Sequence, residues 1–256
     1  MTSTTFSAAM KTAPGMRTRV VNVMRLHLVN RFQMILAPWM IMSFIFAVSL
    51  LIGLMFQPAR ASRPDRAADF TMEFNGAVLY FLIYMLVLAV MAINQVFPFA
   101  QSYSVTRRDF YVGTILTFLT LSITYSIVIT VLGWIEDATN GWGLDVSVFN
   151  PGFLGPNLLE RFSILVVMFL FFFMVGMATA SVYVRWGAYG MYVFFGALAL
   201  LILGLSWLTT ATDSWIAVGN WMATMGLLGV VMWSLAPSGL AIITGYLILR
   251  RSTPRN

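Results

Sequence analysis

The sequence has very little charge. Only 9% of its 256 residues are Asp, Glu, Lys or Arg, and 60% are hydrophobic, whereas about 25% of an average soluble domain is charged. A soluble protein covers its surface with ionised groups, and this chain has too few of them to do so. The composition therefore excludes a soluble globular domain and predicts a membrane protein.

Residue types that carry out chemistry are also scarce. The chain has no cysteine, which excludes disulfides, thiol nucleophiles and thiolate metal sites. Its single histidine, His27, leaves no imidazole cluster for a metal, and its single lysine, Lys11, is not part of a GxxxxGK[ST] phosphate-binding loop. We therefore expect no catalytic site, metal site or bound cofactor, and any ATP dependence must come from a partner protein.

Six apolar stretches are long enough to cross a bilayer, which takes about 20 residues of helix for about 30 Å of hydrocarbon. Backbone groups in lipid must be paired within the segment, and the alternating pattern of a barrel strand is missing, so helices are predicted. None of the six contains an ionised residue. We expect an all-α transmembrane domain over residues 35–249, with spans at 35–56, 77–97, 112–134, 163–184, 188–208 and 227–249.

The segments that precede and follow these spans are polar or basic. Residues 1–15 predict a flexible cytoplasmic tail and residues 250–256 a basic cytoplasmic tail. Residues 16–34 have an amphipathic pattern, which favours a helix lying in the membrane interface over a plain cytosolic extension of the first span. The apolar side of this helix is expected to carry Val20, Val21, Met24 and Leu28.

The apolar stretch 215–249 is too long for one span, since it would measure about 50 Å as a single helix. Two spans here would place Arg250 and Arg251 on the opposite side of the membrane from the N-terminus, which the charge bias opposes. We therefore expect residues 213–226 to form an outer interfacial or re-entrant piece that leads into the sixth span.

The charges are sorted between the two sides of this arrangement. With the N-terminus inside, the inner segments hold 11 of the 15 basic residues and one acid, and the outer segments hold 4 basic and 8 acidic residues. Such a bias predicts six spans with both termini cytoplasmic in the plasma membrane. The basic residues occur in short clusters between apolar runs, which indicates membrane topology and not a nucleic-acid surface.

No ionisable residue lies within a predicted span, which argues against ion-driven carriers and intramembrane hydrolases. The many aromatic and methionine side chains suit an amphipathic or lipid-like cargo. Polar and small residues inside the spans either line a path or join helices, and a dimer seam is a further alternative for the small ones. These candidates are Asn94, Gln95, Ser122, Tyr125, Gly176 and Ala180.

The connection between the second and third spans, residues 98–111, is the most informative segment. It leaves the membrane at Pro98 and offers Ser104 or Thr106 as a helix cap, which predicts a short helix parallel to the inner face. The exposed side chains of this helix are expected to include Arg107, Arg108, Asp109 and Phe110. The alternative is that the two arginines only follow the positive-inside rule beside an aromatic anchor.

In this connection the sequence SVTRRDFYVG resembles a cytosolic loop of ABC-2 type transporter permeases, which often reads G-V-S-R-R-x-F-x-x-G. The matching residues are Thr106, Arg107, Arg108, Phe110 and Gly113, whereas the first glycine of the pattern is absent. The six-helix plan and the lack of an ATPase domain are also similar to that family.

The resemblance implies an exporter built from two permease subunits, as a homodimer or with a related permease, and two ABC ATP-binding subunits that hold ATP and Mg²⁺. It also implies that the segment Thr106, Arg107, Arg108, Asp109 and Phe110 couples to the ATPase. Exporters of this family move drugs, peptides, lipids or polysaccharides. Two other interpretations stay open: a six-helix substrate-capture subunit of an importer, and a membrane scaffold that transports nothing.

Overall fold

The computed structural model describes residues 15–62, 76–102, 105–150, 152–155 and 157–250. The predicted tails 1–15 and 250–256 therefore lie, except for Gly15 and Arg250, outside the described residues. The regular elements of the described part are helices: α1 (Met16–His27), η1 (Phe32–Leu36, a π-helix), α2 (Ala37–Ser62), α3 (Ala77–Ser102), α4 (Arg107–Ala138), η3 (Gly141–Asp145), η4 (Gly152–Leu154), α5 (Leu158–Ala211), α6 (Trp215–Trp233) and α7 (Leu235–Arg250).

Five helical stretches are long and apolar enough to cross a membrane, which confirms the prediction of an all-α membrane protein at this coarse level. They are Phe32–Pro58, Ala77–Ser102, Arg107–Ala138, Leu158–Ala211 and Trp215–Arg250. The six expected spans thus correspond to five continuous helical stretches, because two expected spans lie within α5.

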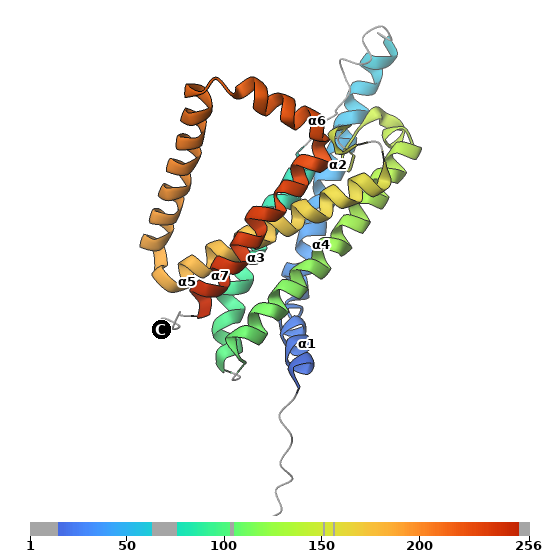
Figure 1. The fold of residues 1–256 in the computed structure, drawn as a ribbon. Coiled ribbons are helices and arrows are strands. Elements are labelled where there is room, and N and C mark those ends of the chain that lie inside the picture. The colour runs from blue at the N-terminus through green and yellow to red at the C-terminus, as the bar shows by residue number, and fades with distance from the viewer. Residues whose placement is uncertain (1–14, 63–75, 103–104, 151, 156, 251–256) are drawn as a thin grey trace, which may run out of the picture.

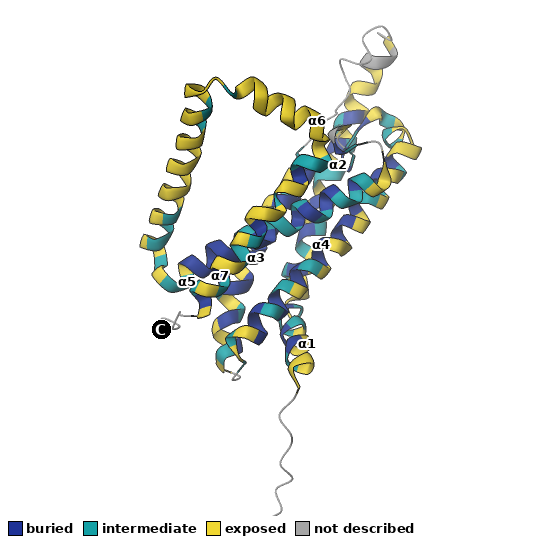
Figure 2. Ribbon diagram, viewed as in Figure 1, coloured by how far each residue is buried: buried dark blue, intermediate teal, exposed yellow. Residues whose placement is uncertain are grey.

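The core of the bundle is formed by α3, α4 and the first half of α5, with α7 packed along α5 and α1 packed against the start of α4 (Figure 1). Large aromatic side chains fill this core. The rings of Phe118 and Phe173 stack with their centroids 4.5 Å apart, and Phe81 lies 6.0 Å from Phe169. Figure 2 shows the buried residues concentrated along these helices, while α2 covers one side and is largely exposed.

Gly176 allows α3 and α5 to approach closely. A Cβ atom on Gly176 would lie 2.5 Å from the carbonyl oxygen of Leu86 and 2.8 Å from the Cβ of Ala89. Ala180, one turn further along α5, is also fully buried. Small residues at such a crossing let two backbones meet, so Gly176 packs α5 against α3 within the chain.

The helix α5 contains 54 residues and would extend for about 80 Å as a straight rod, far more than a bilayer requires. It is broken at Gly187, where φ is 67° and ψ is −153°. Only glycine adopts this backbone conformation readily. The break lies between the expected spans 163–184 and 188–208. After it, residues 188–211 rise away from the bundle as a separate limb (Figure 1).

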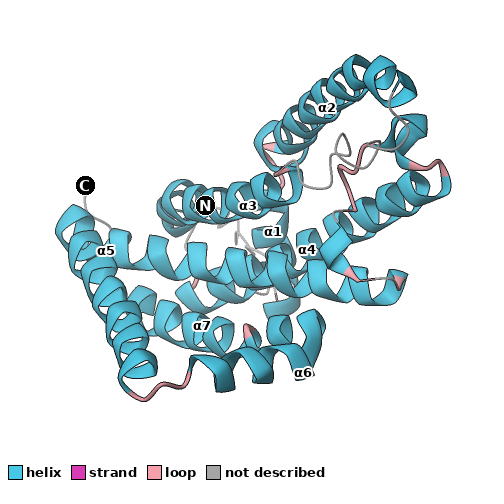
Figure 3. Cartoon of the chain, turned by 90° about the horizontal axis from the view of Figure 1, so that it is seen from above, coloured by secondary structure: helices cyan, strands magenta, loops and turns pink. Residues whose placement is uncertain are grey.

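A second glycine corner lies in α6, at Gly226, where φ is 65° and ψ is 174°. Residues 215–225 run across the end of the bundle, and the chain then turns back along α5 as α7 (Figure 1). The limb and this crossing piece form an open frame beside the bundle, seen from above in Figure 3. Most of the frame is exposed, as at Tyr189 (84%) and Trp207 (71%).

The charged side chains that the structure describes occupy the two opposite ends of the bundle. We call these the α1 end, where α1 begins and α7 ends, and the α6 end, where α6 crosses (Figure 1). The α6 end is mainly acidic: Glu136, Asp137, Asp145, Glu160, Arg161 and Asp213. The α1 end is mainly basic: Arg17, Arg19, Arg25, Arg31, Arg107, Arg108, Asp109, Arg185 and Arg250.

A buried carboxylate orders the loop between α4 and α5 at the α6 end. Glu136 accepts hydrogen bonds from the backbone N–H groups of Val148 (2.9 Å) and Asn150 (2.9 Å). It also accepts from the indole Nε1 of Trp142 at 3.0 Å. Charge-assisted bonds to backbone N–H groups are strong, so this side chain is a structural anchor for the loop.

The crossing of α3 and α5 predicts the effect of a single methyl group. Gly176→Ala should lower the free energy of unfolding by about 1–3 kcal/mol, because the backbone of α3 must move to admit the methyl. The measurement is the thermal midpoint of the purified protein in detergent. Gly196→Ala, in the same helix but with no atom within 4 Å of the added Cβ, is the matched control and should not lower the midpoint. Equal midpoints for the two variants would contradict the assigned contact.

Candidate functional site at the α1 end

The connection between α3 and α4 is shorter than expected. The helix α3 continues through Pro98 to Ser102, and α4 begins at Arg107, so most of residues 98–111 belongs to these two helices. The predicted short helix parallel to the inner face is therefore wrong. Thr106 caps α4, since its Oγ1 accepts a hydrogen bond from the backbone N–H of Asp109 at 3.2 Å. The other proposed cap, Ser104, lies outside the described residues.

Two arginines occupy the first turn of α4. The Nη1 of Arg107 donates a hydrogen bond of 2.6 Å to the backbone oxygen of Arg250, at the last residue of α7. A cation at a helix C-terminus is stabilised by the helix dipole, so Arg107 ties the start of α4 to the end of α7. Arg108 is exposed at the α1 end and is available to a partner.

Asp109 is turned into the protein and not toward a partner. It is 3% exposed, and its Oδ2 lies 3.0 Å from the Nε of Arg19 in α1. The expectation that Asp109 belongs to a surface for the ATPase does not hold in this structure, because an ion pair within the chain uses its carboxylate. This ion pair ties α4 to α1.

Phe110 is buried as well, with 1% of its surface exposed. Its ring centroid lies 5.2 Å from that of Phe97 in α3 and 5.6 Å from that of His27 in α1. The expectation that Phe110 is an exposed coupling residue is wrong for this structure, since its ring packs among side chains of the chain itself. Of the five expected coupling residues, Thr106, Arg107 and Arg108 remain accessible.

The buried face of α1 differs from the expected one. Val20, Val23 and His27 are buried, whereas Val21 is exposed and Met24 is only partly covered. The reason is that α1 packs against α4. A single histidine indicates no metal site, but the position of His27 four residues after Val23 and seven after Val20 places the three on one face of the helix, which is a signal that His27 faces the core.

The hydrogen bonds of His27 fix its tautomer. Its Nε2 lies 2.8 Å from the Oγ1 of Thr114, and that hydroxyl donates its own proton to the backbone oxygen of Phe110 at 2.8 Å. The hydroxyl has a single proton, so when that proton is bonded to Phe110, Nε2 is the donor and Nδ1 is left as an unprotonated acceptor. Burial lowers the pKa of His27 to about 4, so the ring is neutral at physiological pH. Nδ1 has no hydrogen-bond partner among the described residues.

The start of the first long helix is irregular, and two tyrosines compensate for it. Pro38 has no N–H to bond the carbonyl of Met34, four residues earlier, and residues 32–36 form a π-helix. The hydroxyl of Tyr125 donates to the carbonyl of Met34. The hydroxyl of Tyr84 donates to the carbonyl of Gln33 at 2.9 Å. Tyr125 thus pairs a backbone group, whereas the sequence pattern predicted that it either lines a path or joins helices.

The other polar candidates of the spans are distributed along the bundle. Ser122 is buried and Asn94 is half-buried, and neither the hydroxyl of Ser122 nor the Oδ1 of Asn94 has a hydrogen-bond partner in the described part of the chain. Gln95 lies on the wall of a cavity between α1 and α3, described below. Among the residues that the structure describes, no group of three or more His, Cys, Asp or Glu side chains is arranged to hold a metal.

Comparison of the chain with protein-family models, curated proteins and solved structures finds no match. The geometry of the α1 end is the main indication of function. The first turn of α4 is joined to α1 through Asp109 and to α7 through Arg107, and it presents Thr106 and Arg108 at the surface. This arrangement links a surface site mechanically to two other helices.

The tyrosine contact at Met34 gives a testable prediction. Tyr125→Phe removes the hydroxyl that pairs the carbonyl and should lower the free energy of unfolding by about 1–3 kcal/mol, since a buried acceptor is left unpaired. The same substitution at Tyr192, which is 74% exposed, should have little effect. Thermal midpoints in detergent compare the two variants. An equal shift for both would show that the hydroxyl of Tyr125 does not stabilise the bundle.

Proposed function

We propose that this chain is the membrane-spanning permease subunit of an ATP-driven exporter of the ABC-2 type. A separate ABC ATP-binding subunit holds ATP and Mg²⁺ and supplies the energy. The proposal is supported by the SVTRRDFYVG sequence, by the apolar helices and by the lack of a phosphate-binding loop anywhere in the sequence. In this role the chain has no catalytic site of its own.

In the proposed orientation the α1 end faces the cytoplasm of a cell whose plasma membrane the chain crosses six times. The break at Gly187 divides α5 into two spans, and residues 215–225 lie at the outer surface. Both termini are then cytoplasmic. The mainly basic α1 end and the mainly acidic α6 end agree with the positive-inside rule.

The observation that carries the proposal is the attachment of the first turn of α4 to its neighbours. A force that a partner exerts on Arg108 moves α4. This movement is transmitted to α7 through the Arg107–Arg250 hydrogen bond and to α1 through the Asp109–Arg19 ion pair. Closure of two ATPase subunits can therefore tilt several helices at once. Thr106 and Arg108, with the exposed part of Arg107, form the docking surface.

The open frame supports an apolar cargo and a two-subunit assembly. A cavity of about 670 Å³ lies between the two limbs of α5 and the end of α7. Its wall is mostly apolar and aromatic, which suits an amphipathic, lipid-like, drug-like or peptide cargo. The exposed limb, residues 188–211, offers a surface for a second copy of the chain or a related permease. Wall residues include Val182, Trp186, Tyr189, Val193 and Phe194.

The test is purification of the tagged full-length chain from its native membranes in mild detergent. We expect a P-loop ATPase to co-purify at two ATPases per two permeases. Replacing both Arg107 and Arg108 by alanine should reduce the ATPase in the complex by at least about tenfold, since two charge-assisted contacts are lost. Arg25→Ala, an exposed arginine at the same end, is the matched control and should leave the complex intact.

Three results would count against the proposal or its docking surface. If no ATPase co-purifies, the chain is not a subunit of such a transporter, and a membrane scaffold becomes the better interpretation. If an ATPase co-purifies equally with the double variant and the wild type, the docking surface is elsewhere. Tight binding of one small ligand by the isolated chain would instead indicate the capture subunit of an importer.

A further inference from the structure

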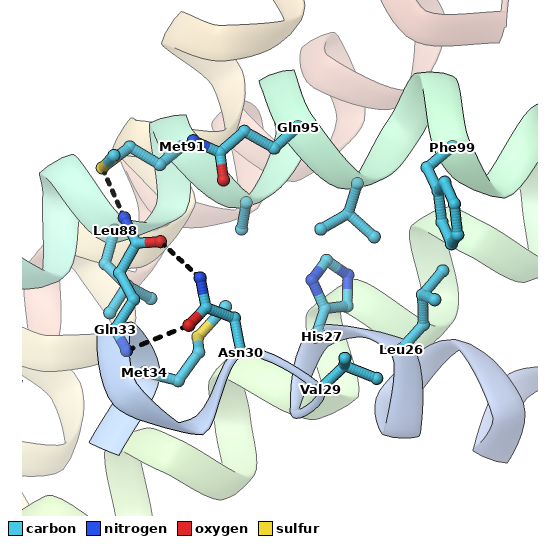
Figure 4. Close-up of a pocket in the computed structure, with 12 residues that line it drawn as sticks. Leu26, His27, Val29, Asn30, Gln33, Met34, Leu88, Met91, Gln95 and Phe99 are labelled. Carbon is cyan, nitrogen blue, oxygen red and sulfur yellow. Dashed lines mark hydrogen bonds between the residues drawn. The ribbon is translucent and has the colours of Figure 1, made fainter. Parts of the chain in front are cut away.

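A cavity of about 170 Å³ lies between the α1–η1 junction and the second half of α3 (Figure 4). One wall carries His27, Asn30 and Gln33, and the opposite wall carries Gln95 among apolar side chains. At about 30 Å³ for each water molecule of the liquid, the volume is that of roughly five waters. The cavity is thus large enough for a small polar head but not for a whole amphiphile.

The cavity contains a buried acceptor with no partner. His27 is 1% exposed, its ring lines the cavity, and its Nδ1 has no hydrogen-bond partner among the described residues. Leaving a buried polar atom unpaired is costly. Since Nε2 is committed to Thr114 as a donor, a ligand must bring a donor to Nδ1.

Donors are available on the same walls. The Nε2 of Gln33 is bonded to the thioether sulfur of Met91 at 2.9 Å, and sulfur is a weak acceptor that an oxygen can replace. The amide of Gln95 faces the cavity from α3 (Figure 4). Besides Nδ1, the site therefore offers the donor groups of two amides and the acceptor oxygen of Gln95 to a ligand that has both a hydroxyl and a carbonyl oxygen.

None of the described residues that line the cavity is charged. An anionic oxygen would meet the lone pair of a neutral Nδ1 and would find no cation to balance its charge. A phosphate is therefore excluded as the group inside the cavity, although arginines lie elsewhere at the α1 end. The ligand is neutral and hydroxylated.

The location indicates a membrane lipid. The cavity adjoins the amphipathic helix α1 and the start of the first long apolar stretch, which is where headgroups meet acyl chains in a bilayer. The remaining wall is apolar and includes Leu26, Val29, Val96 and Phe99. Acyl chains can leave along this surface into the surrounding lipid.

We propose that this cavity binds the neutral, hydroxyl-bearing head of a diacylglycerol-type lipid, with the hydroxyl donating to Nδ1 of His27 and an ester carbonyl accepting from Gln33 or Gln95. This inference requires the membrane location but not the exporter role. The site is separate from the Arg107–Arg108 surface, so either proposal can fail without the other.

The experiment uses the full-length protein in phosphatidylcholine nanodiscs that contain a photo-crosslinking diacylglycerol. Crosslinked residues are identified by peptide mass spectrometry. We expect crosslinks near residues 26–34 and 88–99, and we expect unlabelled diacylglycerol to compete about tenfold better than its O-methyl ether, in which the hydroxyl is blocked. Phosphatidic acid and free glycerol should compete poorly.

His27→Phe keeps an aromatic ring beside Phe110 and Phe118 but removes the acceptor, so it should abolish the preference for the free hydroxyl. Gln95 is an exposed residue on the cavity wall, so Gln95→Leu should leave folding intact. This variant should weaken crosslinking several-fold. Thr124→Val, an exposed hydroxyl that bonds only its own helix, is the matched control and should change nothing.

Three outcomes would overturn the proposal. Equal competition by diacylglycerol and its methyl ether against the wild type would show that Nδ1 binds no hydroxyl. Strong competition by glycerol alone would make the ligand a water-soluble polyol and not a lipid. Crosslinks that avoid both walls of the cavity would indicate that it holds only water.

Discussion

The rest of the structure depends on one constraint: a backbone group in hydrocarbon has no water to bond, so each break in a helix must be compensated or moved to the membrane surface. The chain does both. The corners at Gly187 and Gly226 lie at opposite ends of the bundle, where solvent and headgroups can pair the freed groups. The break near Pro38 lies beside the bundle, and the hydroxyls of Tyr84 and Tyr125 pair the carbonyls there. The shape of the bundle, including the frame beside it, follows from where these breaks fall.

The same constraint sorts the charges and so creates the α1 end as a candidate site. The charged side chains that the structure describes lie at the two ends, and those that are buried there are paired: Asp109 with Arg19, Arg161 with Asp137, and Glu136 with the backbone of its loop. Ion pairs of this kind fix helix ends more than they stabilise the fold. At the α1 end they join α1, α4 and α7 around one exposed turn. A surface that is rigidly tied to three helices is what a coupling element requires.

Much of the fold could be predicted from the sequence, because long apolar runs and glycine corners are local signals. The break near residue 187, the separate piece ending at Gly226 and the cap at Thr106 all have such signals. The site was harder to predict, since burial depends on which helices meet. Asp109 and Phe110 lie in a segment whose sequence is typical of an exposed loop, but the packing of α1 against α4 buries both side chains. The role of His27 depends on its hydrogen bond with Thr114, which is 87 positions away in the sequence. The hydrophobic pattern of a single helix cannot predict a contact over that distance.

In the proposed topology the chain crosses the membrane six times with its α1 end in the cytoplasm. Because the chain has no cysteine, single cysteines can be introduced without further changes and labelled in intact cells with a membrane-impermeant maleimide. The account predicts that Asn140→Cys and Thr212→Cys are labelled from outside, and that Thr18→Cys and Ala188→Cys are labelled only after the membrane is opened. Labelling of Ala188→Cys from outside, or of Thr212→Cys only after opening, would contradict the two-span assignment of α5 and with it the proposed topology.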